Sequence, residues 1–131
     1  MTPRLEVMAA RSKGRGVFAN CRIKKGEIVE VAPVIIVTRK DERCFRELQL
    51  INYCYNWGSK GNQTAFVLGF GCLYNHSYSP NVEHHQRLKR KEMVFRALRN
   101  IAKGEEVTHN YNGSPDDQTP IRFNRNSWEQ M

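Results

Sequence analysis

The sequence predicts one mainly-β domain with a short helix. Its 131 residues fall within the ~100–200 residues typical of a single domain, enough to bury one modest hydrophobic core. Short β-branched and apolar runs alternate with turns rich in glycine, proline and polar residues, a pattern typical of strands rather than of long amphipathic helices. Hydrophobic residues make up 40% and charged residues 26% of the chain, which indicates a globular rather than a disordered protein.

In the first half of the chain, strand-like segments surround one helical segment. Asp41 is a suitable helix N-cap, and Phe45 and Leu48 would share one face of a short helix. Pro33 is expected to separate two strands, because proline lacks the N–H that a sheet needs. The expected elements are strands at 5–8, 27–31 and 34–38, a loop at 12–16, an apolar run at 17–19, a turn at 24–26 and an extended aromatic segment at 52–57.

The second half continues as strands and loops. Residues 82–86 and 92–98 have strand composition, and the intervening 87–91 would join them as a hairpin. Before this hairpin we expect a polar loop at 58–63 and an apolar segment at 65–70. From Gly113 onwards the tail is rich in turn residues and ends with two large aromatic residues, Phe123 and Trp128.

Composition also bears on location and on metal binding. The longest apolar run, residues 34–37, is far shorter than the ~18 residues of a membrane helix, and charged residues interrupt the N-terminal segment. Four widely spaced cysteines include no C-x2-C pair, so we expect free thiols in a reducing compartment and no metal site. We therefore expect a cytoplasmic protein, or a nuclear or chromatin-associated one if the source is eukaryotic or viral.

The chain is basic, with a net charge of +8 from 21 Lys and Arg against 13 Asp and Glu. Such a balance permits contact with nucleic acid or another anionic surface without requiring it. The run Arg87–Lys91, with Arg96 and Arg99 nearby, is the candidate for such contact. A solvated hairpin tip is the simpler interpretation of the same run.

A short pattern, I-x-K-G-E-x-V, occurs twice, at residues 23–29 and 101–107. Two copies so far apart do not indicate a solenoid repeat. Each copy predicts a turn in which glycine takes a positive φ before a strand begins.

Three polar motifs are individually ambiguous. Residues 14–19 fit the G-x-G-x-x-A pattern of a dinucleotide site, but no helix is predicted to follow, which excludes that kind of site. Two interpretations stay open: a glycine turn, or a loop whose backbone lies against a ligand. The N-H-S-x-x-P-N motif at 75–81 follows an apolar segment. It is either a turn whose polar groups hydrogen-bond to one another or a set of polar side chains that binds a ligand. The G-E-E-V-T-H-N-Y motif at 104–111 ends in Tyr111, and its His109 is expected at the surface or at a sheet edge rather than as a general base.

Together, in this order, K-G-R-G-V-F-A, N-H-S-x-x-P-N and G-E-E-V-T-x-N-Y resemble the SET-domain protein-lysine methyltransferases. The resemblance extends from about Val7 to Tyr111, and the short chain is similar to minimal bacterial or viral members. It implies a SET-domain β-clip fold of small curved sheets with a C-terminal pseudoknot. In that arrangement residues 1–113 form the SET domain, and residues 114–131 form a C-terminal tail that completes the site.

The resemblance also implies a reaction and its site residues. The reaction is methyl transfer from S-adenosylmethionine to lysine side chains of a protein or peptide substrate, a histone tail if the host has histones. Tyr111 matches the catalytic tyrosine, and Tyr53 is similar to the tyrosine that walls the lysine channel, with Tyr55 as the competing choice. The implied cofactor-binding residues are Lys13, Gly14, Arg15, Gly16, Asn75, His76, Tyr111 and Phe123.

Two departures from the family pattern stand out, and alternatives to an enzyme remain open. Asn110 precedes the tyrosine where the family often has aspartate, and the cysteine-rich flanks of eukaryotic members are absent, so Phe123 or Trp128 would have to cover the adenine. A homodimer is the other means of completing the site. The alternatives are a catalytically silent SET-like peptide-binding module and a small basic nucleic-acid-binding protein.

Overall fold

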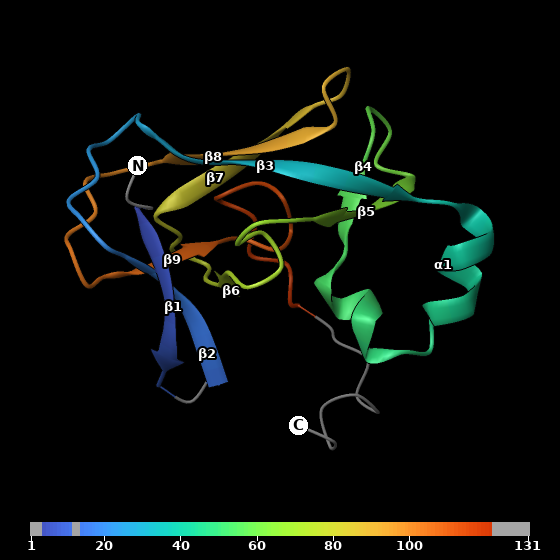
Figure 1. The fold of residues 1–131 in the computed structure, drawn as a ribbon, viewed down its shortest axis with the longest axis horizontal. Helices are drawn as coiled ribbons and strands as arrows, with labels where there is room; N and C mark the ends of the chain where they lie inside the picture. The colour runs from blue at the N-terminus through green and yellow to red at the C-terminus, as the bar shows by residue number, and fades with distance from the viewer. Residues whose placement is uncertain (1–3, 12–13, 122–131) are drawn as a thin grey trace.

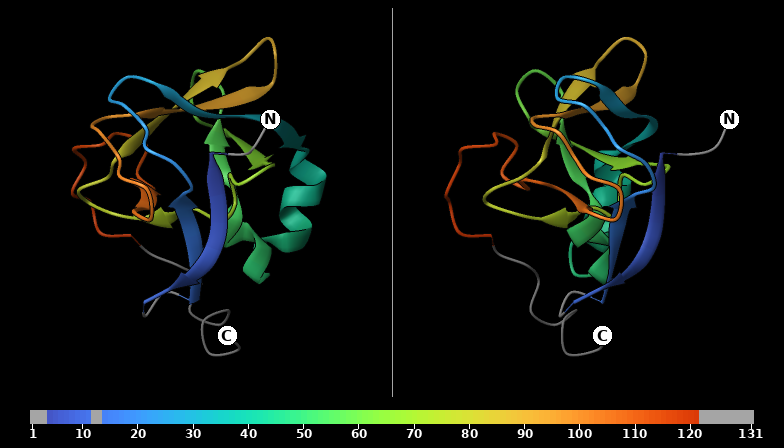
Figure 2. Two further views of the ribbon diagram at one scale, coloured as in Figure 1. Left: turned by 60° about the vertical axis from the view of Figure 1, so that its left-hand side comes forward. Right: turned by 90° about the vertical axis from the view of Figure 1, so that its left-hand side faces the viewer.

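The computed structural model describes residues 4–11 and 14–121 as two β-sheets with a short helix at one end (Figures 1 and 2). One sheet has the strand order β1-β2-β9-β6 and the other β4-β5-β3-β8-β7. The strands are β1 (Leu5–Ala10), β2 (Gly14–Ala19), β3 (Ile28–Val37), β4 (Tyr55–Trp57), β5 (Gln63–Val67), β6 (Asn75–His76), β7 (Val82–Arg87), β8 (Glu92–Ala97) and β9 (Glu106–His109). The mainly-β fold class is confirmed.

The long strand β3 organises the five-stranded sheet. Its first part pairs with β8, as far as Pro33 opposite Glu92, and its second part, from Val34, pairs with β5. The expectation of two strands separated by Pro33 is therefore wrong, because the strand continues and only its partner changes. A residue without an N–H is tolerated at such a change of partner, where the ladder is interrupted in any case.

Three local expectations are also corrected. The helix α1 (Arg39–Phe45) is capped by Thr38, whose side chain accepts from the N–H of Asp41 over 3.1 Å, so Asp41 lies in the first turn. Residues 14–16 are part of β2, paired with β1, rather than a loop. The aromatic segment 52–57 is only partly extended, because a 3-10 helix η1 (Gln49–Tyr53) precedes β4.

The two K-G-E segments pair with each other. Ile23 and Ile101 form an antiparallel bridge, and both are fully buried. The Gly26 N–H donates to the Ala97 carbonyl and the Gly104 N–H to the Ala19 carbonyl, each over 2.8 Å. Both glycines have positive φ, 87° and 88°, as the pattern predicted.

One core cluster joins the two sheets. Its largest fully buried members are Trp57, Tyr74 and Phe95, from β4, the segment before β6, and β8. Tyr74 and Phe95 pack with ring centroids 4.6 Å apart. The helix α1 lies at the far end of the second sheet from the β1–β2 hairpin (Figure 1). No helix among the described residues is long and apolar enough to cross a membrane.

Candidate active site

Segments from distant parts of the chain meet at the end of β9. β6 pairs in parallel with β9, so that Asn75 lies opposite Thr108 and His76 opposite His109. The backbone N–H of Tyr111 donates to Nδ1 of His76 over 3.0 Å. The N-H-S and G-E-E motifs are therefore in direct contact.

Asn81, the last residue of the N-H-S-x-x-P-N motif, holds this arrangement together. It is only 1% exposed. Its side-chain amide donates to the Glu106 carbonyl over 2.7 Å and accepts from the Thr108 N–H over 2.9 Å. A buried amide that satisfies two backbone groups of β9 fixes that strand beside β6. Asn81 was identified from the sequence as part of the motif, but its role in holding β9 was not predicted.

Tyr111 is the central side chain of the site. Its hydroxyl donates to the Tyr74 carbonyl over 2.6 Å, and its ring packs against the rings of His76 and His109, with centroids 5.2 and 4.9 Å away. Burial, followed by the nearby Tyr53, raises the pKa of Tyr111 to about 12. At neutral pH the hydroxyl is therefore protonated, and it can orient and accept rather than act as a base.

A second group of contacts, the asparagine cluster, consists of Asn75, Glu106, Gly16 and the carbonyl of Arg15. The Asn75 amide nitrogen donates to the Arg15 carbonyl over 3.0 Å and to the Glu106 carboxylate over 2.7 Å. A Cβ at Gly16 would collide with Glu106 Oε2 and would lie 2.7 Å from the Asn75 nitrogen. Only glycine lets the main chain of β2 approach these side chains so closely.

The sequence-predicted cofactor residues thus converge in part. Gly14, Arg15 and Gly16 lie on β2, and Asn75 and His76 on β6, with Asn75 bridging the two strands. Gly14 and Arg15 are exposed, while Gly16 is buried in the asparagine cluster. Lys13, Phe123 and Trp128 lie outside the described residues.

A third group, the histidine chain, consists of His84, His109, Tyr55 and the carbonyl of Gly71. The Tyr55 hydroxyl is 2.5 Å from the Gly71 carbonyl and 3.1 Å from His109 Nε2. His109 Nδ1 is in turn 3.2 Å from His84 Nδ1. The rings of Tyr55 and His109 stack with centroids 5.4 Å apart.

The contacts of the histidine chain determine where its protons lie. The Gly71 carbonyl can only accept, so it takes the single hydroxyl proton of Tyr55. His109 must then donate from Nε2 to the Tyr55 oxygen, and a neutral His109 accepts at Nδ1 from His84. Burial lowers the pKa of His84 to about 4 and that of His109 well below its usual value. These lowered pKa values keep both rings neutral at pH 7, which agrees with the assigned hydrogen-bond directions.

His109 corrects a sequence expectation. It was expected at the surface or at a sheet edge, but it is only 3% exposed. The reason is that β9 is an interior strand, with β2 on one side and β6 on the other. For His84 a signal was available, because strand alternation from the buried Val82 places residue 84 on the same face.

The two candidate channel tyrosines have different surroundings. Tyr55 is occupied in the histidine chain. Tyr53 is close enough to Tyr111 to raise the pKa of Tyr111, second only to burial. Of the two hydroxyls, the one on Tyr55 is therefore committed to contacts within the protein.

The start of the tail folds back on the site through Asn110 and Tyr78. Asn110 is 2% exposed, and its amide nitrogen donates to the Asp117 carbonyl over 2.7 Å. The Tyr78 hydroxyl donates to the Thr119 carbonyl over 3.2 Å and accepts from the Ile121 N–H over 3.1 Å. An aspartate at 110 could not donate to a carbonyl, so the departure from the family pattern suits this contact with the tail.

The thiols and acidic groups offer no metal site in the part of the chain that the structure describes. The four cysteines are free. No group of three or more His, Cys, Asp or Glu side chains within 4–11 and 14–121 could hold a metal ion.

Comparison with known proteins identifies the family. The family model "SET domain" matches residues 14–112. The chain belongs to the SET-domain family. Members of this family are protein-lysine methyltransferases that use S-adenosylmethionine.

Individual SET-domain proteins are similar over most of the chain. A Schizosaccharomyces pombe protein named histone-lysine N-methyltransferase, H3 lysine-37 specific, is 32% identical over 108 residues, which cover 82% of this chain and 72% of that protein. A Plasmodium falciparum variant-silencing SET domain-containing protein is 31% identical over 127 residues, covering 82% of this chain but only 5% of that much longer protein.

A solved structure supports the fold. A Plasmodium falciparum crystal structure, whose name describes a candidate histone methyltransferase, matches with a TM-score of 0.68 at 30% identity and covers 87% of this chain and 97% of that one. The mainly-β SET-domain fold with one short helix is confirmed.

Proposed function

We propose that this protein transfers methyl groups from S-adenosylmethionine to lysine side chains of a protein substrate. The observation that carries the proposal is the position of Tyr111, whose hydroxyl is fixed by the Tyr74 carbonyl beside the N-H-S segment. Family membership supports the reaction class.

The asparagine cluster is the proposed cofactor site. The close approach of Gly16 to Asn75 and Glu106, and the contact of Asn75 with the Arg15 carbonyl, support this proposal. The Glu106 carboxylate and the Arg15 carbonyl are acceptors suited to the ammonium group of an amino-acid moiety. Asn75 and His76 would hold the cofactor from β6. Lys13 and Phe123 remain proposed contacts from outside the described residues.

The cofactor supplies an activated methyl group on a positively charged sulfur. The chain's own residues must provide a neutral amine and its alignment. Free lysine has a pKa near 10.4, so only roughly 0.1% is neutral at pH 7.4. The partly buried aromatic surroundings of Tyr111, which already raise the pKa of its own hydroxyl, would lower the pKa of an entering lysine by the same desolvation.

Tyr111 then acts by position. Its proton is given to the Tyr74 carbonyl, so the lone pairs of its oxygen remain to accept from the amine or from methyl C–H groups. Holding the reacting groups in line contributes about 7 kcal/mol or more for well-aligned groups in comparable reactions. Tyr53, next to Tyr111, would form one wall of the lysine channel.

The substrate is proposed to be a histone tail if the host has histones, because the similar Schizosaccharomyces pombe protein is named for lysine 37 of histone H3. A nuclear location would follow in a eukaryote.

We also propose that two copies pair as a homodimer to complete the site. Light scattering at working concentration checks this, and a monomeric mass would contradict it.

The activity test combines labelled cofactor with core histones and with a whole-cell lysate, followed by mass spectrometry of the labelled lysines. Tyr111→Phe should lower methyl transfer at least ~10-fold, the loss of about 1.4 kcal/mol of transition-state stabilisation. Cofactor affinity, measured by calorimetry on chelator-treated protein, should change less. Cofactor binding without any labelled lysine would favour a silent binding module, and unchanged turnover by Tyr111→Phe would exclude Tyr111 from the mechanism.

A further inference from the structure

The paired K-G-E segments carry a row of positive charge outside the candidate active site. The Ile23 N–H donates to the Ile101 carbonyl over 2.9 Å, and the Ile101 N–H donates back over 2.8 Å. With both isoleucines buried, the residues on either side of them reach solvent. The exposed cations of this pairing, called the basic stripe below, are Arg22, Lys24, Lys25, Arg99 and Lys103.

The glutamates of the two K-G-E segments, Glu27 and Glu105, are engaged by the turns themselves. Glu27 accepts from the Lys24 N–H over 2.7 Å and pairs with Arg4 over 3.2 Å. Glu105 accepts from the Ala102 N–H over 2.9 Å and pairs with Arg99 over 2.7 Å. These contacts lower the pKa of both carboxyls, for Glu105 against the opposing effect of burial, so each carboxylate is charged and paired with a cation at neutral pH.

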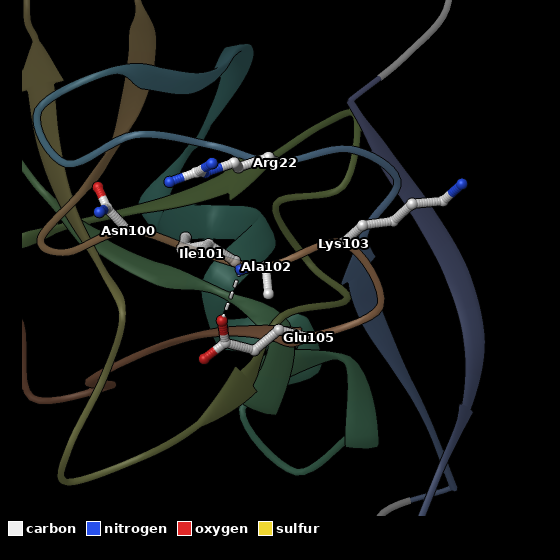
Figure 3. A pocket seen from close by; sticks show the side chains of 6 residues that line it. All are labelled: Arg22, Asn100, Ile101, Ala102, Lys103 and Glu105. Carbon is white, nitrogen blue, oxygen red and sulfur yellow. Dashed lines mark hydrogen bonds between the residues drawn. The ribbon is translucent and has the colours of Figure 1, made fainter.

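The remaining cations of the basic stripe keep their full charge toward solvent. Within residues 4–11 and 14–121, the side chains of Arg22, Lys24, Lys25 and Lys103 have no carboxylate at salt-bridge distance. A cavity of about 370 Å³ opens among Arg22, Asn100, Ile101, Ala102, Lys103 and Glu105. Arg22 extends toward Asn100, whereas Lys103 extends away in the other direction, so Arg22 is the cation that faces this cavity, with Glu105 also lining it (Figure 3).

We propose that the basic stripe binds the phosphate backbone of duplex DNA. Arg22 and Lys24 stand on either side of the buried Ile23 at the bridge, so both can contact a polyanion with closely spaced charges, such as DNA with one phosphate per about 3.4 Å of axis along each strand. The pairing of the two segments, with the Lys25 N–H also held by Asn100 over 2.9 Å, gives the cations a fixed backbone.

The same residues do not suit a membrane surface. A segment that lies on a lipid interface presents apolar side chains among its cations, to be buried below the headgroups. Here the apolar residues between the cations, Ile23 and Ile101, are fully buried in the protein core. The basic stripe therefore offers charge without an apolar anchor.

The test measures binding of a labelled 20-base-pair duplex by fluorescence anisotropy at several salt concentrations, with the full chain and no cofactor. The variant Arg22→Gln/Lys24→Gln/Lys103→Gln removes three charges of the basic stripe. The matched control, Lys89→Gln/Arg90→Gln/Lys91→Gln, removes three exposed charges from the β7–β8 hairpin tip. Circular dichroism melting verifies that both variants fold.

The stripe variant should bind the duplex at least 10-fold more weakly at low salt, and its slope of log affinity against log salt should be smaller by about 3. The hairpin control should keep the slope of the natural chain. Equal losses in the two variants, or no duplex binding by the natural chain, would overturn the proposal. Binding to phosphatidylserine vesicles that matches or exceeds duplex binding, with the same sensitivity to the stripe variant, would also overturn it.

Discussion

The asparagine cluster and the histidine chain both lie beside Tyr111, but they differ in kind. The asparagine cluster is built around main-chain atoms and one carboxylate, with Asn75 only half-buried. The histidine chain is built from uncharged side chains in the interior, linked from His84 to the Gly71 carbonyl. Both use polar groups on one another, but the first includes a charged carboxylate and half-exposed groups beside exposed β2 residues, whereas the second is uncharged and enclosed. Proximity to Tyr111 therefore does not make a residue a ligand-binding one.

The largest expected effect is acid destabilisation through the histidine chain. The folded-state pKa of His84, about 4, lies below the unfolded value near 6.5. The unfolded state thus binds more protons between these values, so stability is full above pH 6.5 and falls as the pH drops toward 4. At pH 5 His84 costs about 2 kcal/mol of unfolding free energy, and His109 acts in the same direction.

Urea unfolding at pH 7.5 and at pH 5 measures this loss. His84→Asn keeps an N–H donor for His109 but does not titrate, so it should reduce the difference between the two pH values. His85→Asn, at the exposed neighbouring position, is the comparison variant: it removes a ring that contacts Glu83 over 3.0 Å and contributes less than burial to the low pKa of His84, so it should change the difference less than His84→Asn does. The same pH dependence in His84→Asn as in the natural chain would contradict the hydrogen-bond assignment.

The next effect concerns cofactor binding by the asparagine cluster. Asn75→Ala removes the donor to Arg15 and Glu106, and we expect it to weaken cofactor binding or the fold by ~1–3 kcal/mol. Calorimetry and thermal melting measure the two effects, with the exposed Asn56→Ala on β4 as the control. An unchanged melting temperature together with unchanged affinity would make this segment a surface turn.

Substitutions of Tyr53 and Tyr55 further distinguish a structural role in the histidine chain from a role beside Tyr111. Tyr55→Phe leaves the Gly71 carbonyl and the His109 N–H without their partner, so it should destabilise the fold by ~1 kcal/mol or more. Tyr53→Phe should leave stability nearly unchanged and alter methyl transfer instead. If Tyr53→Phe destabilises the protein while Tyr55→Phe changes only turnover, the assignment of the channel tyrosine is reversed.

The asparagine cluster was more accessible to sequence reasoning than the histidine chain. Asn75, His76 and Tyr111 stand in recognisable motifs, and glycine at position 16 predicts a close approach whatever the strand pairing. The burial of His109 depends on β9 having neighbours on both sides, which is a property of tertiary pairing and not of the local sequence. The prediction that Pro33 separates two strands was wrong for a similar reason. A change of pairing partner within one strand cannot be predicted from the sequence of that strand alone.

The smallest expected effect concerns the C-terminal tail and tests whether the residues after Gly113 contribute to cofactor binding together with the asparagine cluster. Truncation after Gly113 removes the carbonyls that Asn110 and Tyr78 contact, so it should raise the cofactor dissociation constant and lower the melting temperature together. Truncation after Ile121 keeps those contacts and removes Phe123 and Trp128, so it should raise the dissociation constant severalfold with little change in melting temperature, because stacking on one aromatic ring contributes about 1 kcal/mol. Calorimetry and thermal melting on both truncated chains distinguish the two contributions. Cofactor and substrate binding by both truncations at the strength of the full chain would exclude the tail from the site.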